Sequence, residues 1–168
     1  LMKNKKFIEI PKSLNFELLN PKINLKSLNE FKNKHFISKS DFVIGTFARY
    51  EKISVEYLDL VSQILSRDSS RKIIIAGSND RSFVENKLKK FIISKQAIVL
   101  GVSDVHILGN CCNVFLDTIP FPCGSSAIEI MAKGKPVLSI QQLNLANYKK
   151  SRVPELISKD EEKLNKVI

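Results

Sequence analysis

The sequence predicts an α/β fold built on parallel strands, and two observations carry this prediction. Short apolar runs rich in Val, Ile and Leu alternate with segments of helical periodicity along most of the chain. In addition, residues 114–140 have the pattern of a strand, a loop broken by Pro and Gly, a helix and a second strand. Two strands joined in this way within one sheet are parallel, with a right-handed crossover.

Strands and helices can be placed in order along the chain. Five apolar runs are expected to form strands: residues 42–45, 71–76, 97–100, 114–116 and 136–140. Helices are expected after these runs, each with an apolar face and a residue suited to its first turn. Their predicted starts are Ser54, Asp80 or Ser82, the turn before His106, Ser125 or Ser126, and Pro154 in a helix running through Leu156 and Ile157.

One domain is expected over residues 41–168, ending in a helical tail, because a chain of 168 residues is long enough for one core. Residues 1–40 carry nine Lys and three Glu. We expect this segment to be a basic linker or arm, or an extension that packs on another domain. The chain begins with Leu1 before Met2, which suggests a fragment of a longer protein.

Composition argues against several classes of function. The net charge is +10, but no helix carries a basic stripe and no stacking aromatic motif occurs, so nucleic acid is not an expected partner. No apolar run approaches the roughly 20 residues of a membrane span, and no signal-peptide pattern is present. We therefore expect a cytoplasmic protein without a transmembrane segment. The three cysteines have no C-x-x-C spacing, so neither a disulfide framework nor a zinc site is predicted.

Residue types suited to binding phosphate gather at the start of the helix that follows the fourth strand. Gly124 permits close approach, Ser125 and Ser126 offer hydroxyls, and a first helical turn has backbone N–H groups without intrahelical partners. One turn further on, Glu129 shares a face with the serines, where a carboxylate could accept hydrogen bonds from a ribose. The same spacing also fits a capping box, in which the acid bonds back to the N–H of a serine cap.

Three further side chains follow strand ends. Arg49 and Lys52 lie in the loop after the first strand, and His106 follows the third. In an open α/β sheet, ligands bind at the carboxyl ends of the strands, so we expect these side chains near one crevice. Each could instead be an ordinary surface or structural residue.

Several well-known nucleotide-binding and hydrolase motifs are absent from the sequence. There is no G-x-x-x-x-G-K-[ST] loop, no G-x-G-x-x-G after the first strand and no G-x-S-x-G. A P-loop nucleotidase, a dinucleotide dehydrogenase and a serine hydrolase with a nucleophile elbow are therefore not supported.

One stretch of the sequence has a specific order of residues: Phe115, Leu116, Asp117 and Thr118, then Pro120 and Phe121, the turn of Gly124, Ser125 and Ser126, then Glu129, and finally Gly134, Lys135, Pro136 and Val137. With this stretch, roughly residues 41–157 resemble the C-terminal half of GT-B glycosyltransferases. The likeness is greatest to the O-linked N-acetylglucosamine transferases and the related bacterial cytoplasmic N-glycosyltransferases. The resemblance implies a Rossmann-like, three-layer α/β/α domain with a mostly parallel sheet, which is one half of a GT-B fold.

The resemblance also implies a donor substrate and a role for each candidate residue. The implied donor is a nucleotide sugar, a UDP-sugar in these relatives, which delivers a hexose or N-acetylhexosamine to an acceptor protein or glycan. No cofactor is implied. Carried over by position, the donor diphosphate contacts are Lys52, Arg49, Gly124, Ser125 and Ser126, the ribose contact is Glu129, and the residue near the base is His106.

The sequence has no D-x-D motif, which counts against a donor diphosphate held through a metal bound by two aspartates. We therefore expect a metal-independent site, in which a lysine and a helix N-terminus stabilise the charge that develops on the leaving diphosphate.

In GT-B enzymes, the candidate base and most acceptor contacts come from the N-terminal half, which here would be a domain of the same parent chain. The catalytic residues therefore stay unassigned, and we expect this chain alone to bind nucleotide sugar weakly without turnover. Two alternatives stay open. One is the C-terminal half of a sugar-nucleotide epimerase with GT-B architecture, and the other is a non-catalytic α/β interaction module.

Overall fold

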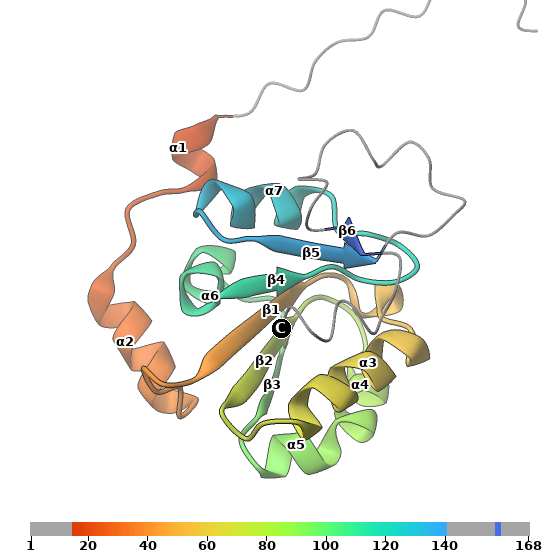
Figure 1. Cartoon of the computed structure of the whole chain (residues 1–168). Helices are drawn as coiled ribbons and strands as arrows, with labels where there is room; N and C mark the ends of the chain where they lie inside the picture. Colours follow the sequence, from red (N-terminus) through yellow and green to blue (C-terminus); the bar gives the residue numbers. More distant parts are fainter. Residues whose placement is uncertain (1–14, 141–156, 159–168) are drawn as a thin grey trace, which may run out of the picture.

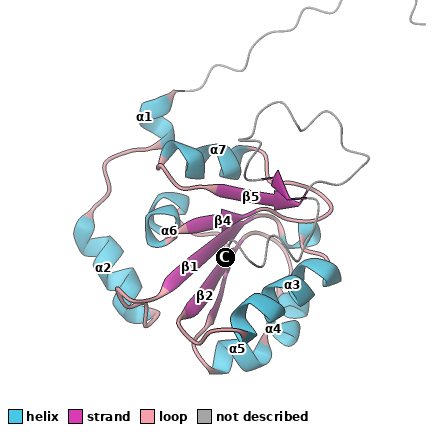
Figure 2. Cartoon of the chain, viewed as in Figure 1, coloured by secondary structure: helices cyan, strands magenta, loops and turns pink. Residues whose placement is uncertain are grey.

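The computed structural model describes residues 15–140 and 157–158, which build a single sheet with helices on both faces (Figures 1 and 2). Within these residues the sheet has six strands, all parallel, in the order β3-β2-β1-β4-β5-β6. The strands are β1 (Phe42–Phe47), β2 (Arg71–Ala76), β3 (Ala97–Leu100), β4 (Val114–Leu116), β5 (Val137–Ile140) and β6 (Ile157–Ser158). The predicted α/β fold with a parallel sheet between two helix layers is confirmed.

The helices after β1 and β2 cover one face of the sheet, and those after β3 and β4 cover the other (Figure 1). The first layer consists of α3 (Val55–Ser66), α4 (Ser82–Lys87) and α5 (Lys89–Ile93). The second consists of α6 (Val105–Cys111) and α7 (Ser125–Ala132), on which α2 (Leu25–Lys34) and α1 (Phe16–Leu19) pack. The chain changes face between β1 and β4, which are neighbours in the sheet. Such a switch point is where open α/β sheets bind their ligands.

The central strands are buried on both faces, as expected for strands of a parallel sheet. Ile73 and Ile75 of β2 pack against the layer of α3, α4 and α5, whereas Ile74 packs against the layer of α6 and α7. This alternation is the two-residue period of a strand. Because both faces are covered, the strand sequences are apolar at nearly every position.

Strands β1 and β4 pair over a short length. Their register consists of two residue pairs, at Ile44 and Gly45 of β1. Beyond these pairs the Thr46 hydroxyl donates to the Leu116 carbonyl at 2.8 Å and also hydrogen-bonds to the hydroxyl of Tyr57 in α3. A buried side chain thus continues the contact between the two strands beyond their backbone pairs.

Some element boundaries differ from those predicted. Strand β1 continues two residues beyond Gly45. The helix after β2 is preceded by Arg81 at the cap position, and Asp80 instead accepts from the N–H and hydroxyl of Ser82 at 3.0 and 2.6 Å. This helix breaks at Leu88 into α4 and α5, and the break accompanies complete burial of the Leu88 side chain.

The two ends of the predicted domain give different outcomes. The cap at Ser54 is confirmed, because its hydroxyl oxygen accepts the N–H of Tyr57 at 3.2 Å. At the other end, Ile157–Ser158 form strand β6, where the sequence predicted a helix. Here parallel pairing with β5 takes precedence over the local helical pattern. Pro154 and Leu156 of that predicted helix lie outside the described residues.

The described part of the N-terminal segment packs on this domain. Asn24 caps α2 by accepting the N–H of Lys26 at 2.9 Å, and Leu28 and Ile37 are buried in the core beside α6. Residues 1–14 of the predicted linker or arm lie outside the described residues.

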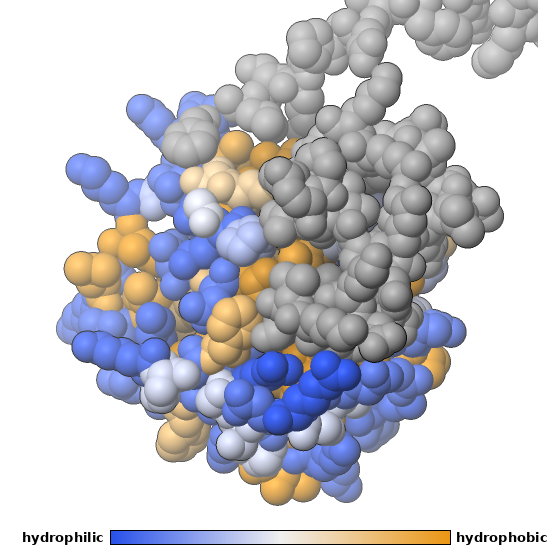
Figure 3. All heavy atoms as spheres, viewed as in Figure 1, coloured by the Kyte–Doolittle hydropathy of each residue, from blue (hydrophilic) through white to orange (hydrophobic). Residues whose placement is uncertain are grey.

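The outer surface in Figure 3 is mostly hydrophilic, with smaller hydrophobic areas between the polar side chains. No helix among the described residues is long and apolar enough to span a membrane.

Gly77 lets the loop after β1 run close to the end of β2. The N–H of Ala48 donates to the Ala76 carbonyl at 3.0 Å, and the N–H of Tyr50 donates to the Ser78 carbonyl at 3.2 Å. The loop after β1 and the loop after β2 therefore stay hydrogen-bonded beyond the ends of the strands. A Cβ atom on Gly77 would lie 1.8 Å from the Ala48 carbonyl oxygen, so only glycine fits here without a backbone shift.

We expect Gly77→Ala to lower the free energy of unfolding by about 1–3 kcal/mol, because the backbone must move to relieve the clash. Urea unfolding followed by circular dichroism measures this difference. The matched control is Gly101→Ala, whose Cβ atom would meet only the Arg81 guanidinium at 3.9 Å and should change stability by less than about 0.5 kcal/mol. Equal stability of the two variants would contradict the close approach at Gly77.

Candidate functional site

A cavity of about 240 Å³ lies at the carboxyl ends of the strands, where the loops after β1, β2 and β3 meet helices α6 and α7. Its position is the switch point of the sheet, where ligands of such folds are bound. The lining residues are Phe47, Ala48, Arg49, Ala76, Gly77, Ser78, Val102, Ser103, Val105, Leu108, Ser126 and Glu129.

The cavity brings together three of the residues that the sequence singled out. Ser126 and Glu129 lie three residues apart on α7 and are both half-buried, so one face of this helix presents a hydroxyl and a carboxylate to the cavity. Arg49 reaches the cavity from the loop after β1 and is exposed, with Nη1 3.9 Å from Oε2 of Glu51. A cation, a carboxylate and a hydroxyl thus line one crevice.

The start of α7 settles how its serines are used. Gly124 occupies the cap position, and no side chain hydrogen-bonds to the cap. Ser125 and Ser126 are therefore the first two helical residues, and Glu129 lies too far along the helix to complete a capping box. The capping-box interpretation is wrong. Gly124 and Ser125 are exposed, so the N–H groups of the first turn lie at an open helix end of the type that binds anions.

Lys52 lies beside the loop that precedes α7 and is not among the described residues that line the cavity. It ends the 3-10 turn η1 (Tyr50–Lys52), and its Nζ donates to the carbonyl of Pro122 at 3.1 Å. Burial raises the pKa of the Cys123 thiol, and the positive charge of Lys52 is one of the influences that oppose this rise. The ammonium group is therefore close to the residues that lead into Gly124.

His106 is the second residue of α6 and lies next to the cavity wall. Its N–H donates to Oδ1 of Asp104 at 2.8 Å, and its neighbours Val105 and Leu108 line the cavity. The Nδ1 atom of His106 is buried and has no hydrogen-bond partner within the described residues. The role near the base stays a prediction.

Tyr50 holds the loop after β1 against the strand ends, although the sequence did not single it out. Its hydroxyl donates to the Leu100 carbonyl at 2.6 Å and to the Ile75 carbonyl at 3.3 Å. Burial raises the pKa of Tyr50 to about 12, so the hydroxyl keeps its proton at neutral pH. The only signal in the sequence is an aromatic residue between Arg49 and Lys52, directly after a strand.

Asp117 follows β4, and the resemblance included it without giving it a role. Its side chain is 2% exposed and binds polar groups on both sides. Oδ1 accepts the N–H of Thr118 at 3.1 Å and that of Cys123 at 2.6 Å, while Oδ2 accepts the hydroxyl of Ser139 in β5 at 2.7 Å. The signal in the sequence is an acid placed directly after a buried strand.

No protein-family model matches this sequence, and no curated protein sequence matches it. Solved structures do match its fold. The O-GlcNAc transferase of Thermobaculum terrenum, solved as a mutant, aligns with a TM-score of 0.65 and 21% identity, covering 77% of this chain and 28% of that chain. HepE of Anabaena in complex with UDP and glucose aligns with a TM-score of 0.67 and 16% identity, covering 92% and 44%.

A third match is the C-terminal domain of a group 1 glycosyl transferase, LpcC, from Francisella tularensis, with a TM-score of 0.63 and 15% identity. The alignment covers 92% of this chain and 85% of that domain. This chain thus spans less than half of the first two structures but most of an isolated C-terminal domain. The chain has the fold of one Rossmann-like half of a GT-B glycosyltransferase, as the sequence predicted.

Proposed function

We propose that this chain is the donor-binding domain of a glycosyltransferase that uses a UDP-sugar without a metal. In this proposal it serves transfer of a hexose or N-acetylhexosamine to an acceptor protein or glycan. The observation that carries the proposal is the meeting of Arg49, Ser126 and Glu129 in one cavity, beside the open first turn of α7. Catalysis would further require an acceptor-side domain of the same parent chain.

The diphosphate is proposed to bind between the loop after β1 and the start of α7. When the glycosidic bond to the donor breaks, negative charge develops on the diphosphate and must be stabilised. Arg49 and the positive end of the α7 dipole supply favourable charge at this place. Lys52 adds a third contribution, because an ammonium group has three donors and can keep its bond to Pro122 while donating to phosphate.

The ribose is proposed to lie against Glu129. A carboxylate can accept hydrogen bonds from two neighbouring hydroxyls, and such charge-assisted bonds are stronger than neutral ones. Glu129 is one turn from the start of α7, so a nucleotide whose phosphates lie at Ser125 and Ser126 has its ribose within reach. The structure of HepE with UDP and glucose supports uracil as the base. His106 is the proposed residue beside the base.

The size of the cavity supports a site that is completed by a second domain. Pockets that enclose a small molecule have volumes of about 300–1,000 Å³. The volume here is about 240 Å³, and the cavity is formed at the carboxyl ends of the strands by loops and by helices α6 and α7. We propose that the acceptor-side domain covers this face and encloses the sugar.

We expect UDP to bind more tightly than GDP, CDP or ADP, and EDTA to leave its affinity unchanged. Isothermal titration calorimetry of the folded chain, with and without EDTA, measures both properties. Millimolar nucleotide without a binding signal would contradict the proposal for the isolated chain. Binding that EDTA abolishes would contradict metal independence.

We expect Lys52→Ala and Glu129→Ala each to weaken UDP binding by about tenfold, because each removes a charged hydrogen-bond partner of the ligand. The effect of Glu129→Ala should shrink with 2′,3′-dideoxy-UDP, which lacks the hydroxyls that Glu129 is proposed to bind. Calorimetry with both ligands gives the comparison.

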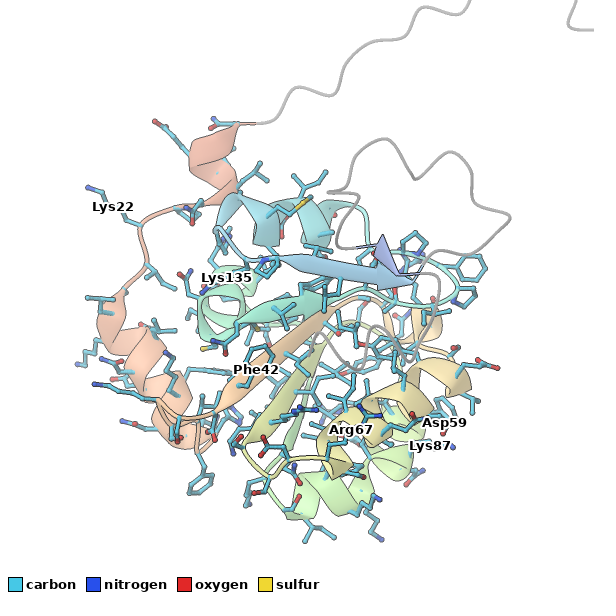
Figure 4. The ribbon with its side chains drawn as sticks, in the orientation of Figure 1. Lys22, Phe42, Asp59, Arg67, Lys87 and Lys135 are labelled. Atoms are coloured by element: carbon cyan, nitrogen blue, oxygen red, sulfur yellow. The ribbon has the colours of Figure 1, made fainter. Side chains whose placement is uncertain are left out.

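Lys87→Ala is the matched control for the charge change in Lys52→Ala. Lys87 donates to Asp59 at 3.0 Å on the surface of the helix layer formed by α3 and α4, as Figure 4 shows. Its replacement should leave the affinity for UDP within about twofold, since exposed charges are screened at physiological salt. A loss equal to that of Lys52→Ala would mean that net charge alone governs binding.

We expect the chain alone not to transfer sugar, because the catalytic base and the acceptor contacts are proposed to belong to an acceptor-side domain. Incubation with UDP-glucose and UDP-N-acetylglucosamine and a panel of acceptor peptides and glycans, followed by mass spectrometry, tests this expectation. Acceptor glycosylation by the purified chain without a partner would contradict the proposal that an acceptor-side domain supplies the base and the acceptor contacts.

A further inference from the structure

The loop between β4 and α7 is closed by one buried carboxylate. Asp117 is held in place by its own N–H, which donates to the Leu138 carbonyl of β5 at 2.9 Å, and by the Ser139 hydroxyl, which donates to Oδ2 at 2.7 Å. Its Oδ1 accepts the N–H groups of Thr118 and Cys123, at 3.1 and 2.6 Å. The side chain therefore links the first residue of the loop to the residue just before Gly124.

Two backbone carbonyl groups of this loop, those of Phe121 and Pro122, also accept hydrogen bonds. The Thr118 hydroxyl donates to the Phe121 carbonyl at 2.5 Å, and Lys52 Nζ donates to the Pro122 carbonyl at 3.1 Å. A carbonyl oxygen repels an anion, so pairing these two groups with donors reduces their repulsion at the start of α7. The loop is thus held by Asp117 on one side and by Lys52 on the other.

We infer that Asp117 is a positioning residue for the diphosphate: by binding the Cys123 N–H and the Ser139 hydroxyl, it orients the loop that presents the first turn of α7. This inference rests on the proposed function. Asp117 does not contact the ligand in this arrangement. The backbone N–H groups that follow Gly124 would bind the phosphate, and Asp117 would hold them in position. The inference predicts that replacing Asp117 weakens the binding of a ligand that carries the diphosphate and leaves the binding of the nucleoside unchanged.

A carboxylate suits this task better than a neutral side chain. Its two oxygens accept the two N–H groups and the hydroxyl together, and bonds to an ionised acceptor are shorter and stronger than neutral ones. The three donors come from the loop start, the loop end and β5, so the side chain fixes all three relative to one another. Replacement by asparagine keeps the shape but loses the charge.

The test compares UDP with uridine on the complete 168-residue chain, by titration followed with NMR. We expect Asp117→Asn to weaken UDP binding about tenfold while uridine binding stays within about twofold. Ser139→Ala, which removes the hydroxyl that donates to Oδ2, should weaken UDP binding about threefold with the same selectivity. In Asp117→Asn the amide of Cys123 should also exchange with solvent faster than in the wild type.

The control is Gln96→Ala, at the opposite end of the sheet. The Gln96 amide donates to the carbonyls of Leu65, Asp68 and Arg71, so its loss lowers stability without touching the loop. The ratio of UDP to uridine affinity should stay at its wild-type value in this variant. A changed ratio would mean that lowered stability, rather than the loop, controls phosphate binding, and would overturn the inference.

The outcomes separate the inference from the proposed function. If the wild type binds UDP no better than uridine, the diphosphate site is absent, and both the proposed function and the inference are wrong. If the wild type prefers UDP and the Asp117→Asn variant keeps that preference, or loses both ligands equally, only the inference is overturned. Should Asp117→Asn fail to fold, the preference of Ser139→Ala decides in the same way.

Discussion

The short pairing of β1 with β4 is the feature on which the rest of this site depends. Two residue pairs join these strands, after which the chain on each side leads to a different helix layer. Beyond these pairs the Thr46 hydroxyl still bonds to the Leu116 carbonyl. The loop that leaves β1 and helix α7, which follows the loop that leaves β4, both line a cavity at this place. The position of this cavity is therefore a direct result of strand order.

Hydrogen bonds from buried polar side chains fix the carboxyl ends of the strands and the loops that follow them. Thr46 bonds to the carbonyl of Leu116, Tyr50 to that of Leu100, and Asp117 to the N–H of Cys123. Each bond joins a strand end or its loop to a neighbouring segment. An unpaired buried polar group would cost about 1–3 kcal/mol, so these contacts restrict the loops to few arrangements. The cavity is shaped by such side chains as much as by the packing of apolar ones.

The sequence predicted the strands well because each is a short apolar run ended by polar or breaking residues, as at Arg71–Ala76 and Ala97–Leu100. It also predicted that Arg49, Lys52 and His106 lie near one crevice, because ligands of such sheets bind at the carboxyl ends of the strands. Among the described residues, Arg49 lines the cavity, whereas Lys52 and His106 lie beside it. The position of Lys52 beside Pro122 and the bracing role of Tyr50 could not be predicted. These contacts join residues 70 and 50 positions apart, and no local pattern encodes them. Likewise, spacing could not tell whether a serine or Gly124 would cap α7.

The short pairing of β1 with β4 also has a consequence for the order of folding. Residues 42–100 contain β1, β2 and β3 with their connecting helices, so neighbouring strands there are close in sequence. The β1 and β4 partners are about 70 residues apart, and closing so long a loop costs more chain entropy before contacts compensate it. We expect the three-stranded half to form first and β4 to join it late. The crevice would then be among the last parts of the molecule to acquire its shape, and among the first to lose it when the chain unfolds.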